Sequence, residues 1–183
     1  MTIRRVIIIL IGYLLMSTSS IAETPSELVS ETYQDWIVRC SSIIDNGKAV
    51  TFCEMSQDLR HSESGQRVLA IGIQDGGSGD SGIATVIAPF GLRLSSGLDI
   101  LVPGRERIKT PFETCMPTGC IARVAFDQET LEAFKRGVSA DIVVTANASG
   151  EDVTINLSLA GFTAAWNRLR ELSLKIRTMS GIR

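Results

Sequence analysis

The sequence predicts a mainly β protein: a single antiparallel domain, built as a β-sandwich or barrel, with two short helices and two disulfide bonds. About eight short apolar segments, several alternating apolar with polar residues, are separated by turn signals, which favours antiparallel strands over alternating β–α units. Four cysteines in a chain with an export signal favour disulfide bonds. Two later segments carry helical spacing or helix-capping residues instead.

The chain begins with the pattern of an export signal. Two arginines form a basic start, an apolar run covers 6–16, and Ser20-Ile21-Ala22 has the small residues of a cleavage site. The apolar run is shorter than the roughly 20 residues of a membrane-spanning helix. We therefore predict a signal peptide over 1–22, cleavage between Ala22 and Glu23, and an exported protein in the periplasm or associated with the outer membrane.

The remaining 161 residues have the size of one domain with a core of its own. Loss of the two leader arginines from 18 basic residues leaves 16 against 20 acidic ones, a formal charge of −4. A nucleic-acid binder needs a basic footprint, so nucleic acid is not an expected partner. We divide this part into a flexible lead-in over 23–35, a β domain over 36–170 and a basic C-terminal tail over 171–183.

The domain is expected to start with a hairpin. Trp36, Val38 and Cys40 fall on one face of a strand over 36–40. Asp45-Asn46-Gly47 is a strong turn signal, and a second strand over 49–55 carries Cys53. A disulfide between the two strands would hold this hairpin.

The middle of the chain predicts short strands with turns between them. After a polar segment over 56–67, strands are expected at 68–73, 83–88, 92–94, 98–102 and 121–126, with a flexible glycine-rich loop at 76–82.

The last part of the domain combines two helices with two strands. Asp127 is expected to cap a short helix that ends with two basic residues before Gly137. Strands follow over 140–146 and 153–159, and Thr163 is expected to cap the final helix. The residues that share one face of that helix are Trp166, Leu169, Leu172 and Ile176.

The cysteines favour structural disulfides over metal or redox chemistry. Zinc sites use closely spaced cysteine or histidine pairs, and the chain has a single histidine, His61. A thioredoxin-like motif needs Cys-x-x-Cys, which is absent. Four cysteines allow three pairings, and we favour Cys40–Cys53 with Cys115–Cys120 because both are local.

Two groups of residues suggest hydrolytic chemistry without completing it. Gly79-Asp80-Ser81-Gly82 resembles the nucleophile loop of trypsin-like proteases, but a triad needs all its members, and His61 precedes Ser81 by twenty residues. His61 with Asp58 and Glu63 would make a general-base pair, yet no activated nucleophile stands beside it. A glycine-rich loop and a solvated histidine are the favoured interpretations.

Two other groups carry weak ligand signals. Asp75 and Asp80 offer carboxylates to calcium, but the close acidic ladder of a calcium loop is missing. Trp36 and Trp166 would form a ligand platform if exposed, but each lies on an apolar stripe, which favours core packing. We predict no cofactor and no metal.

The C-terminal segment is basic. Its cations are Arg168, Arg170, Lys175, Arg177 and Arg183, against Glu171 alone. A basic amphipathic helix can rest on an anionic membrane surface, so these five residues are candidates for surface binding. The alternative, which is the commoner arrangement, is a helix packed on the sheet with a solvated charged end.

Four groups of residues together resemble the invasion-associated locus B family of exported bacterial proteins. They are Trp36 with Cys40 and Cys53; Ala88-Pro89-Phe90-Gly91-Leu92 followed by Ser96-Gly97-Leu98; Cys115 with Gly119-Cys120; and Leu157-Ser158-Leu159-Ala160-Gly161-Phe162. The resemblance covers roughly 36–169. It implies a compact β-rich domain of the periplasm or outer envelope, with disulfides at the matching cysteines and no catalytic residues.

The first functional hypothesis is an exported, non-enzymatic envelope protein that binds a partner or surface, in envelope integrity or host-cell interaction. Its expected partner is an envelope protein or a host-surface component. One alternative is a hydrolase of an envelope polymer that uses carboxylates such as Asp80 or Glu113, which would have to lie about 5–9.5 Å apart. Another is a small-ligand carrier with an apolar cavity inside the β domain.

Overall fold

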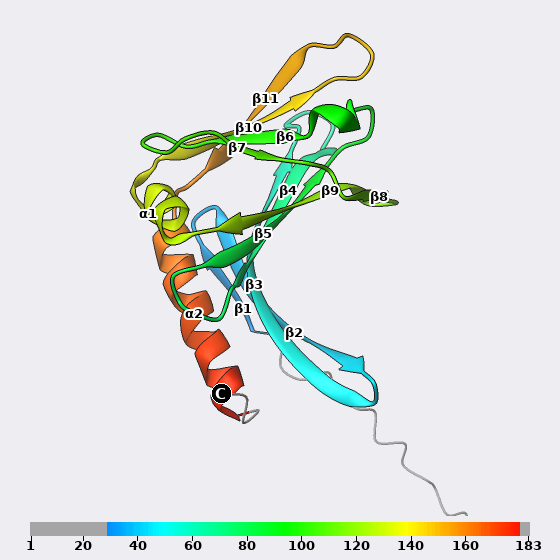
Figure 1. Ribbon diagram of the computed structural model, residues 1–183. Helices are drawn as coiled ribbons and strands as arrows, with labels where there is room; N and C mark the ends of the chain where they lie inside the picture. The colour runs from blue at the N-terminus through cyan, green and yellow to red at the C-terminus, as the bar shows by residue number, and fades with distance from the viewer. Residues whose placement is uncertain (1–28, 180–183) are drawn as a thin grey trace, which may run out of the picture.

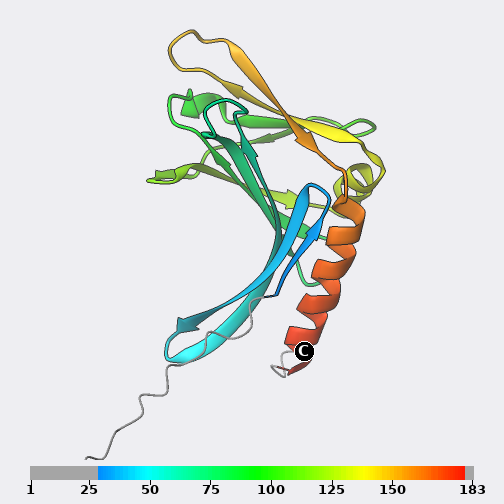
Figure 2. The same ribbon diagram turned by 180° about the vertical axis from the view of Figure 1, so that it is seen from behind.

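The computed structural model describes residues 29–179 and confirms a mainly β fold made of two antiparallel sheets and two helices (Figures 1 and 2). The predicted signal peptide, its cleavage site at Ala22 and Glu23, and the cation Arg183 lie outside the described residues.

The larger sheet has seven strands in the order β1-β2-β3-β4-β5-β9-β8. Their bounds are Ser30–Tyr33 for β1, Trp36–Asp45 for β2, Lys48–Arg60 for β3, Arg67–Asp75 for β4, Gly82–Ala88 for β5, Thr114–Met116 for β8 and Gly119–Phe126 for β9. The first five strands follow one another through hairpins, which is the simplest antiparallel connection.

The smaller sheet has four strands in the order β11-β10-β6-β7. Their bounds are Asp152–Ser158 for β11, Ser139–Thr145 for β10, Leu98–Leu101 for β6 and Ile108–Thr110 for β7. Helix α1 covers Gln128–Arg136, helix α2 covers Phe162–Met179, and a single 3-10 turn covers Leu94–Ser96.

The core lies on one face of the larger sheet, between that sheet, the two helices and the smaller sheet. Alternate residues are buried there, as strand alternation requires, over 36–40 of β2, 53–57 of β3, 69–73 of β4, 82–88 of β5 and 120–126 of β9. An aromatic cluster joins the layers: Trp36 meets Phe162 edge-on at 5.2 Å between ring centroids, and Phe134 lies 4.7 Å from Phe126 and 5.3 Å from Phe162. Trp36 and Trp166 are both completely buried, so the predicted core role is confirmed.

The two helices behave largely as their sequences indicate. The Asp127 carboxylate accepts a hydrogen bond from the Thr130 backbone N–H at 2.8 Å, so the predicted cap of α1 is confirmed. The predicted cap of α2 at Thr163 is wrong, because the helix already begins at Phe162 and the Thr163 hydroxyl donates to the Lys135 carbonyl at 3.3 Å. The apolar face of α2 packs on the larger sheet, with Trp166, Leu169 and Leu172 buried.

The predicted lead-in and the predicted tail both contain regular structure. The lead-in over 23–35 contains strand β1, which pairs with β2 from Ser30–Arg39 to Tyr33–Trp36. The bound between 170 and 171 falls inside α2, which is continuous from the domain into the predicted tail. In both places a charged segment is held by packing and long-range ion pairs that composition does not show.

Several strand predictions also need correction. The segment 92–94 is no strand and makes only one bridge, Leu92 to Ala146. Strands β7 and β8 were not expected, because three residues are too few to show alternation. The segment over 56–67, which the sequence marks only as polar, begins inside the sheet: β3 continues to Arg60 because its polar residues fall on the open face.

Candidate interaction site

The four cysteines form the two predicted disulfides. Cys40 and Cys53 face each other in the register of β2 and β3, with 4.0 Å between their Cα atoms, and Cys115 faces Cys120 across the β8–β9 turn at 3.9 Å. A tight antiparallel turn brings residues directly opposite, which explains why the local pairs form. Both bonds hold hairpins and leave no thiol for chemistry.

The open face of the larger sheet is the first candidate for contact with a partner. One face of this sheet is committed to the core, whereas the side chains of the opposite face along β3, β4, β5 and β9 are half-buried or exposed. In the middle of this face Ser56, Gly72 and Thr85 lie side by side on β3, β4 and β5. Small residues in adjacent strands lower the sheet surface at this point.

These small residues form the floor of a surface hollow of about 240 Å³. Its wall combines cations, carboxylates and apolar groups. The residues that line it are Arg39, Glu54, Ser56, Gln57, Asp58, Arg67, Ala70, Ile71, Gly72, Thr85 and Ile87. We call it the sheet hollow. Its volume is below the roughly 300–1,000 Å³ of small-molecule pockets and suits a single side chain or sugar ring of a larger partner.

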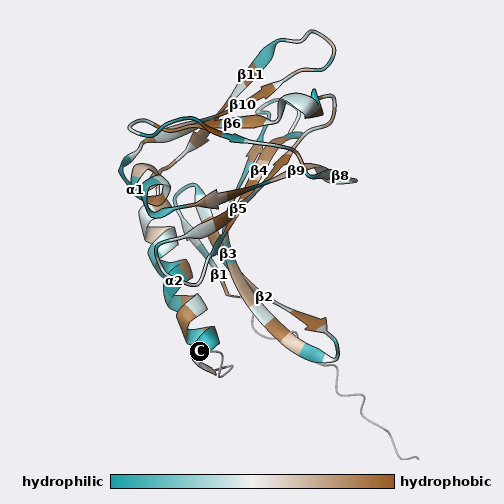
Figure 3. Ribbon diagram, viewed as in Figure 1, coloured by the Kyte–Doolittle hydropathy of each residue, from teal (hydrophilic) through white to brown (hydrophobic). Residues whose placement is uncertain are grey.

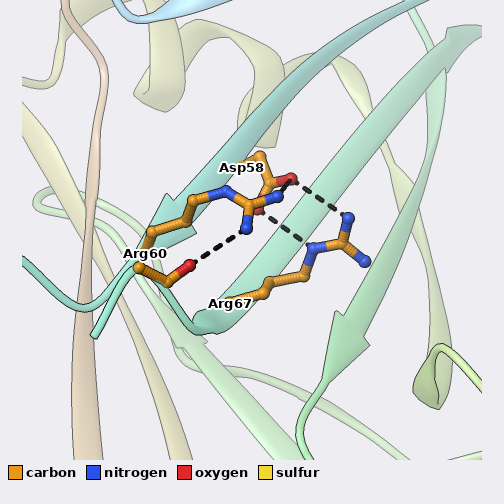
Figure 4. Close-up of polar contacts among 4 residues, drawn as sticks. Asp58, Arg60 and Arg67 are labelled. Atoms are coloured by element: carbon orange, nitrogen blue, oxygen red, sulfur yellow. Dashed lines mark hydrogen bonds and ion pairs between the residues drawn. The ribbon is translucent and has the colours of Figure 1, made fainter.

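One wall of the sheet hollow is an ion-pair cluster, shown in Figure 4. The Asp58 carboxylate accepts from Arg67 through two bonds of 3.0 and 3.1 Å and from Arg60 at 3.0 Å, while Arg60 also donates to the Gly65 carbonyl at 3.0 Å. Partial burial raises the pKa of Asp58, but the hydrogen bonds and charges of Arg67 and Arg60 outweigh it and hold this pKa below its usual value. The cluster therefore carries a net positive charge.

Glu54 supplies the opposite charge on the floor. Its carboxylate lies over Gly72, where a Cβ atom would come within 3.1 Å of Oε2. Within residues 29–179 Glu54 forms no ion pair, although Arg39 faces it in the register. The sheet hollow thus offers guanidinium donors and a carboxylate acceptor a few residues apart, which suits a partner with hydroxyl, amine or carboxylate groups.

Comparison with known proteins places the chain in a family. The model of the family described as Invasion associated locus B (IalB) protein matches residues 36–170. The chain belongs to the invasion associated locus B family. The resemblance predicted from the four groups of residues is therefore confirmed.

Relatives of the family agree over most of the chain. The invasion protein B homolog of Brucella abortus strain 2308 is 35% identical over 147 residues, which are 79% of this chain and 81% of the relative. Invasion protein B of Bartonella bacilliformis is 29% identical over 159 residues, 84% of this chain and 82% of that protein. The crystal structure of invasion associated protein b from Bartonella henselae matches with a TM-score of 0.69 and 27% identity, over 80% of this chain and 98% of that one.

The structure does not assemble the hydrolytic groups considered in the sequence. His61 and Ser81 lie beyond opposite ends of β4, and the Ser81 hydroxyl is within 2.8 Å of that of Ser78. Asp58, the expected partner of His61, is already bound by two arginines. The carboxylates Asp80 and Glu113 also lie apart. Asp80 precedes Gly82, which pairs with Phe126 at one end of the β5–β9 pair, whereas the Glu113 backbone N–H donates to the Ile121 carbonyl near the other end.

The predicted calcium carboxylates are likewise not brought together. Asp75 is buried, with 1% of its side chain exposed, and it binds Arg177 at 2.9 Å and the Gly77 backbone N–H at 3.2 Å. Asp80 is exposed in the loop that follows. Within the described residues no group of three histidine, cysteine or acidic side chains has the arrangement of a metal site.

Most of the predicted surface-binding cations are used inside the molecule. Arg168 binds Glu31 on β1 at 2.7 Å and Glu171 at 2.9 Å, and Arg177 binds Asp75. Arg170 packs against Gly79 of the glycine-rich loop, and its Nε atom is buried. Lys175 is exposed, and no ion pair joins it to another residue of 29–179. Helix α2 therefore does not present a fully solvated basic face.

Sequence reasoning missed the sheet hollow altogether. Its polar residues Glu54, Ser56 and Asp58 alternate with the buried residues Cys53, Met55 and Gln57 along β3. That alternation was the available signal for a strand with one open polar face. The lateral neighbours on β4 and β5 depend on sheet order, which the local pattern does not contain.

Proposed function

We propose that this family member is an exported envelope protein that works by binding a macromolecular partner rather than by catalysis, and that the sheet hollow is its contact site. The partner class is an envelope protein, an envelope glycan or a host-surface component, in envelope integrity or host-cell interaction. One observation carries the proposal: one face of the larger sheet is filled by the core, while the other is open and holds a hollow with both charges.

The family supports this interpretation in a coarser form. The relatives from Brucella and Bartonella are named as invasion proteins or their homologs, and neither name describes an enzyme. The predicted export signal and the two disulfides agree with a location in the periplasm or at the outer membrane, where thiols are oxidised.

The carrier alternative receives less support from the described interior. The space between the layers, where a carrier would hold its ligand, is occupied by Trp36, Phe126, Phe134 and Phe162, all of them at most 1% exposed. The sheet hollow is instead an open surface feature, and partners of protein–protein type make contact through such surfaces.

The test fills the sheet hollow and leaves the rest of the open face unchanged. Ala70 lines the hollow on β4, so Ala70→Trp should occupy it; Ala125→Trp places the same side chain on the open face of β9, outside the hollow. The mature oxidised protein and both variants serve as bait for envelope extract and for host-cell surface extract. We expect a retained component that Ala70→Trp loses at least tenfold and Ala125→Trp keeps. Retention that is equal for all three baits, or no retained component, would refute the site.

A further inference from the structure

The β2–β3 hairpin extends beyond the body of the molecule and ends in exposed apolar side chains. β1 pairs with β2 only at Trp36–Arg39, and β4 pairs with β3 only from Met55 onward. Past the Cys40–Cys53 bond the hairpin is therefore a two-stranded ribbon. Figures 1 and 2 show its tip at the same end of the molecule as the end of α2, away from the smaller sheet.

Apolar side chains project from both faces of this ribbon. Ile43 and Val50 are paired in the register on one face and are 52% and 43% exposed, while Ile44 points to the other face and is 75% exposed. Figure 3 shows apolar colour reaching this far part of the hairpin. A protein partner covers one face of a ribbon, whereas a lipid layer that the tip enters surrounds both.

The end of α2 lies across a groove from the ribbon and adds apolar side chains at the same end of the molecule (Figure 1). A groove of about 200 Å³ separates the helix from the ribbon and has a mainly apolar lining, which includes Leu172, Ile176 and Met179. Met179 is 71% exposed and Leu174 is 52% exposed. The same end carries Lys175, which lines this groove, is exposed and forms no ion pair with any side chain that the structure describes. Apolar side chains beside an exposed ammonium group match an interface of anionic lipid headgroups above acyl chains.

The backbone of the ribbon limits how deeply the tip can enter. Both outer edges of the ribbon lack a neighbouring strand among the described residues, so their N–H and C=O groups need water. The acyl core provides none, but the headgroup boundary does, to a depth of about 5–10 Å. At about 3.4 Å per residue, roughly three residues on each side of the Asn46-Gly47 turn reach that depth. This segment contains Ile43, Ile44 and Val50.

From these observations we propose that the tip of the β2–β3 hairpin, together with the end of α2, docks into the headgroup layer of an anionic phospholipid membrane. Ile43, Ile44 and Val50 enter the boundary, and Lys175 contacts lipid phosphate. The docking site is separate from the sheet hollow.

The experiment uses the mature oxidised protein and vesicles of phosphatidylcholine with or without phosphatidylglycerol. Co-sedimentation is measured for the wild type, Ile44→Asp and the control Val138→Asp. Val138 is 85% exposed and follows α1. The last turn of α1 contacts the start of α2, so Val138 lies at the end of α2 that is far from the hairpin tip. We expect anionic vesicles to bind the wild type and the control alike, and Ile44→Asp to weaken binding at least tenfold.

A fluorescent variant reports depth directly. The native tryptophans are completely buried, so Ile44→Trp adds the single exposed indole of the described residues. Its emission should shift to the blue when anionic vesicles are added, and Val138→Trp should not shift. No binding to anionic vesicles, equal binding of Ile44→Asp and wild type, or an unshifted Ile44→Trp emission would each overturn the proposal. Failure of the sheet-hollow test has no bearing on this result.

Discussion

Breaking the Arg177–Asp75 ion pair should destabilise the protein much more than removing a neighbouring cation. The Asp75 carboxylate at the end of β4 is 1% exposed, and its partner on α2 is 30% exposed. Arg177→Met nearly keeps the length of the side chain and removes its charge. The Asp75 carboxylate then stays buried and keeps the hydrogen bond from the Gly77 backbone N–H, but loses the guanidinium.

The size of the effect follows from burial. Removing one partner of a fully buried pair costs about 3–5 kcal/mol because it leaves an uncompensated charge. Here Arg177 is partly exposed and Gly77 still donates, so we expect a loss of about 2 kcal/mol in the free energy of unfolding. For a domain of this size that corresponds to a fall in melting temperature of roughly 4–8 °C. The double variant Asp75→Asn/Arg177→Met removes the buried charge and should recover about half of the loss.

Thermal and urea unfolding, followed by far-ultraviolet circular dichroism, measures these differences. The control is Lys175→Met, which removes an exposed cation on the same turn of α2 and should change the free energy of unfolding by less than about 0.5 kcal/mol. Equal effects of Arg177→Met and Lys175→Met, or a double variant less stable than Arg177→Met, would show that burial of Asp75 does not govern the cost.

Two further predictions concern the disulfides and acid stability. Cys40→Ala/Cys53→Ala should lower the free energy of unfolding by about 3 kcal/mol, because the disulfide closes a loop of this length in the unfolded chain and so lowers the entropy of the unfolded state. A wild-type melting temperature that does not respond to reductant would contradict this prediction. Hydrogen bonds from Arg168 and then Tyr33 lower the pKa of Glu31, so the pair stabilises the fold above the unfolded-state pKa and this stability is lost as the pH falls through the folded-state pKa. Glu31→Gln should flatten the fall of the melting temperature between about pH 5 and 3, and an unchanged slope would count against the assignment.

The open polar face of β3 shows the limit of local pattern. The sequence predicts a strand only over 49–55 and a polar segment over 56–67, although β3 continues to Arg60 with alternating burial along 53–58. The sheet hollow also requires Ala70 and Thr85 beside it, and these arrive through the order of β3, β4 and β5. Because a residue on one strand says nothing about its lateral neighbour, the hollow was not predictable from one segment.

The basic segment at the end of the chain makes the same point with charges. Composition predicts a set of cations on the last helix, and the helical spacing of Trp166, Leu169 and Leu172 correctly predicts the face that packs. It does not show that Arg168 meets Glu31, 137 positions earlier, or that Arg177 meets Asp75, 102 positions earlier. The favoured interpretation, a helix packed on the sheet with a solvated charged end, is therefore correct for the packing, but two of the cations near that end are held in ion pairs with the larger sheet.

From the sequence alone come the mainly β class, the disulfide hairpins, the capped helix α1 and the family. The first three depend on residues that are close in the chain or on a pattern repeated along one segment, which alternation and backbone hydrogen bonding make readable. The family depends on the order and spacing of four groups of residues along the chain. Only the tertiary structure decides which cations are free, where the sheet hollow lies and how far the β2–β3 ribbon projects. Those features depend on which distant segments of the chain come into contact in the fold, and a local pattern of residues does not contain that information.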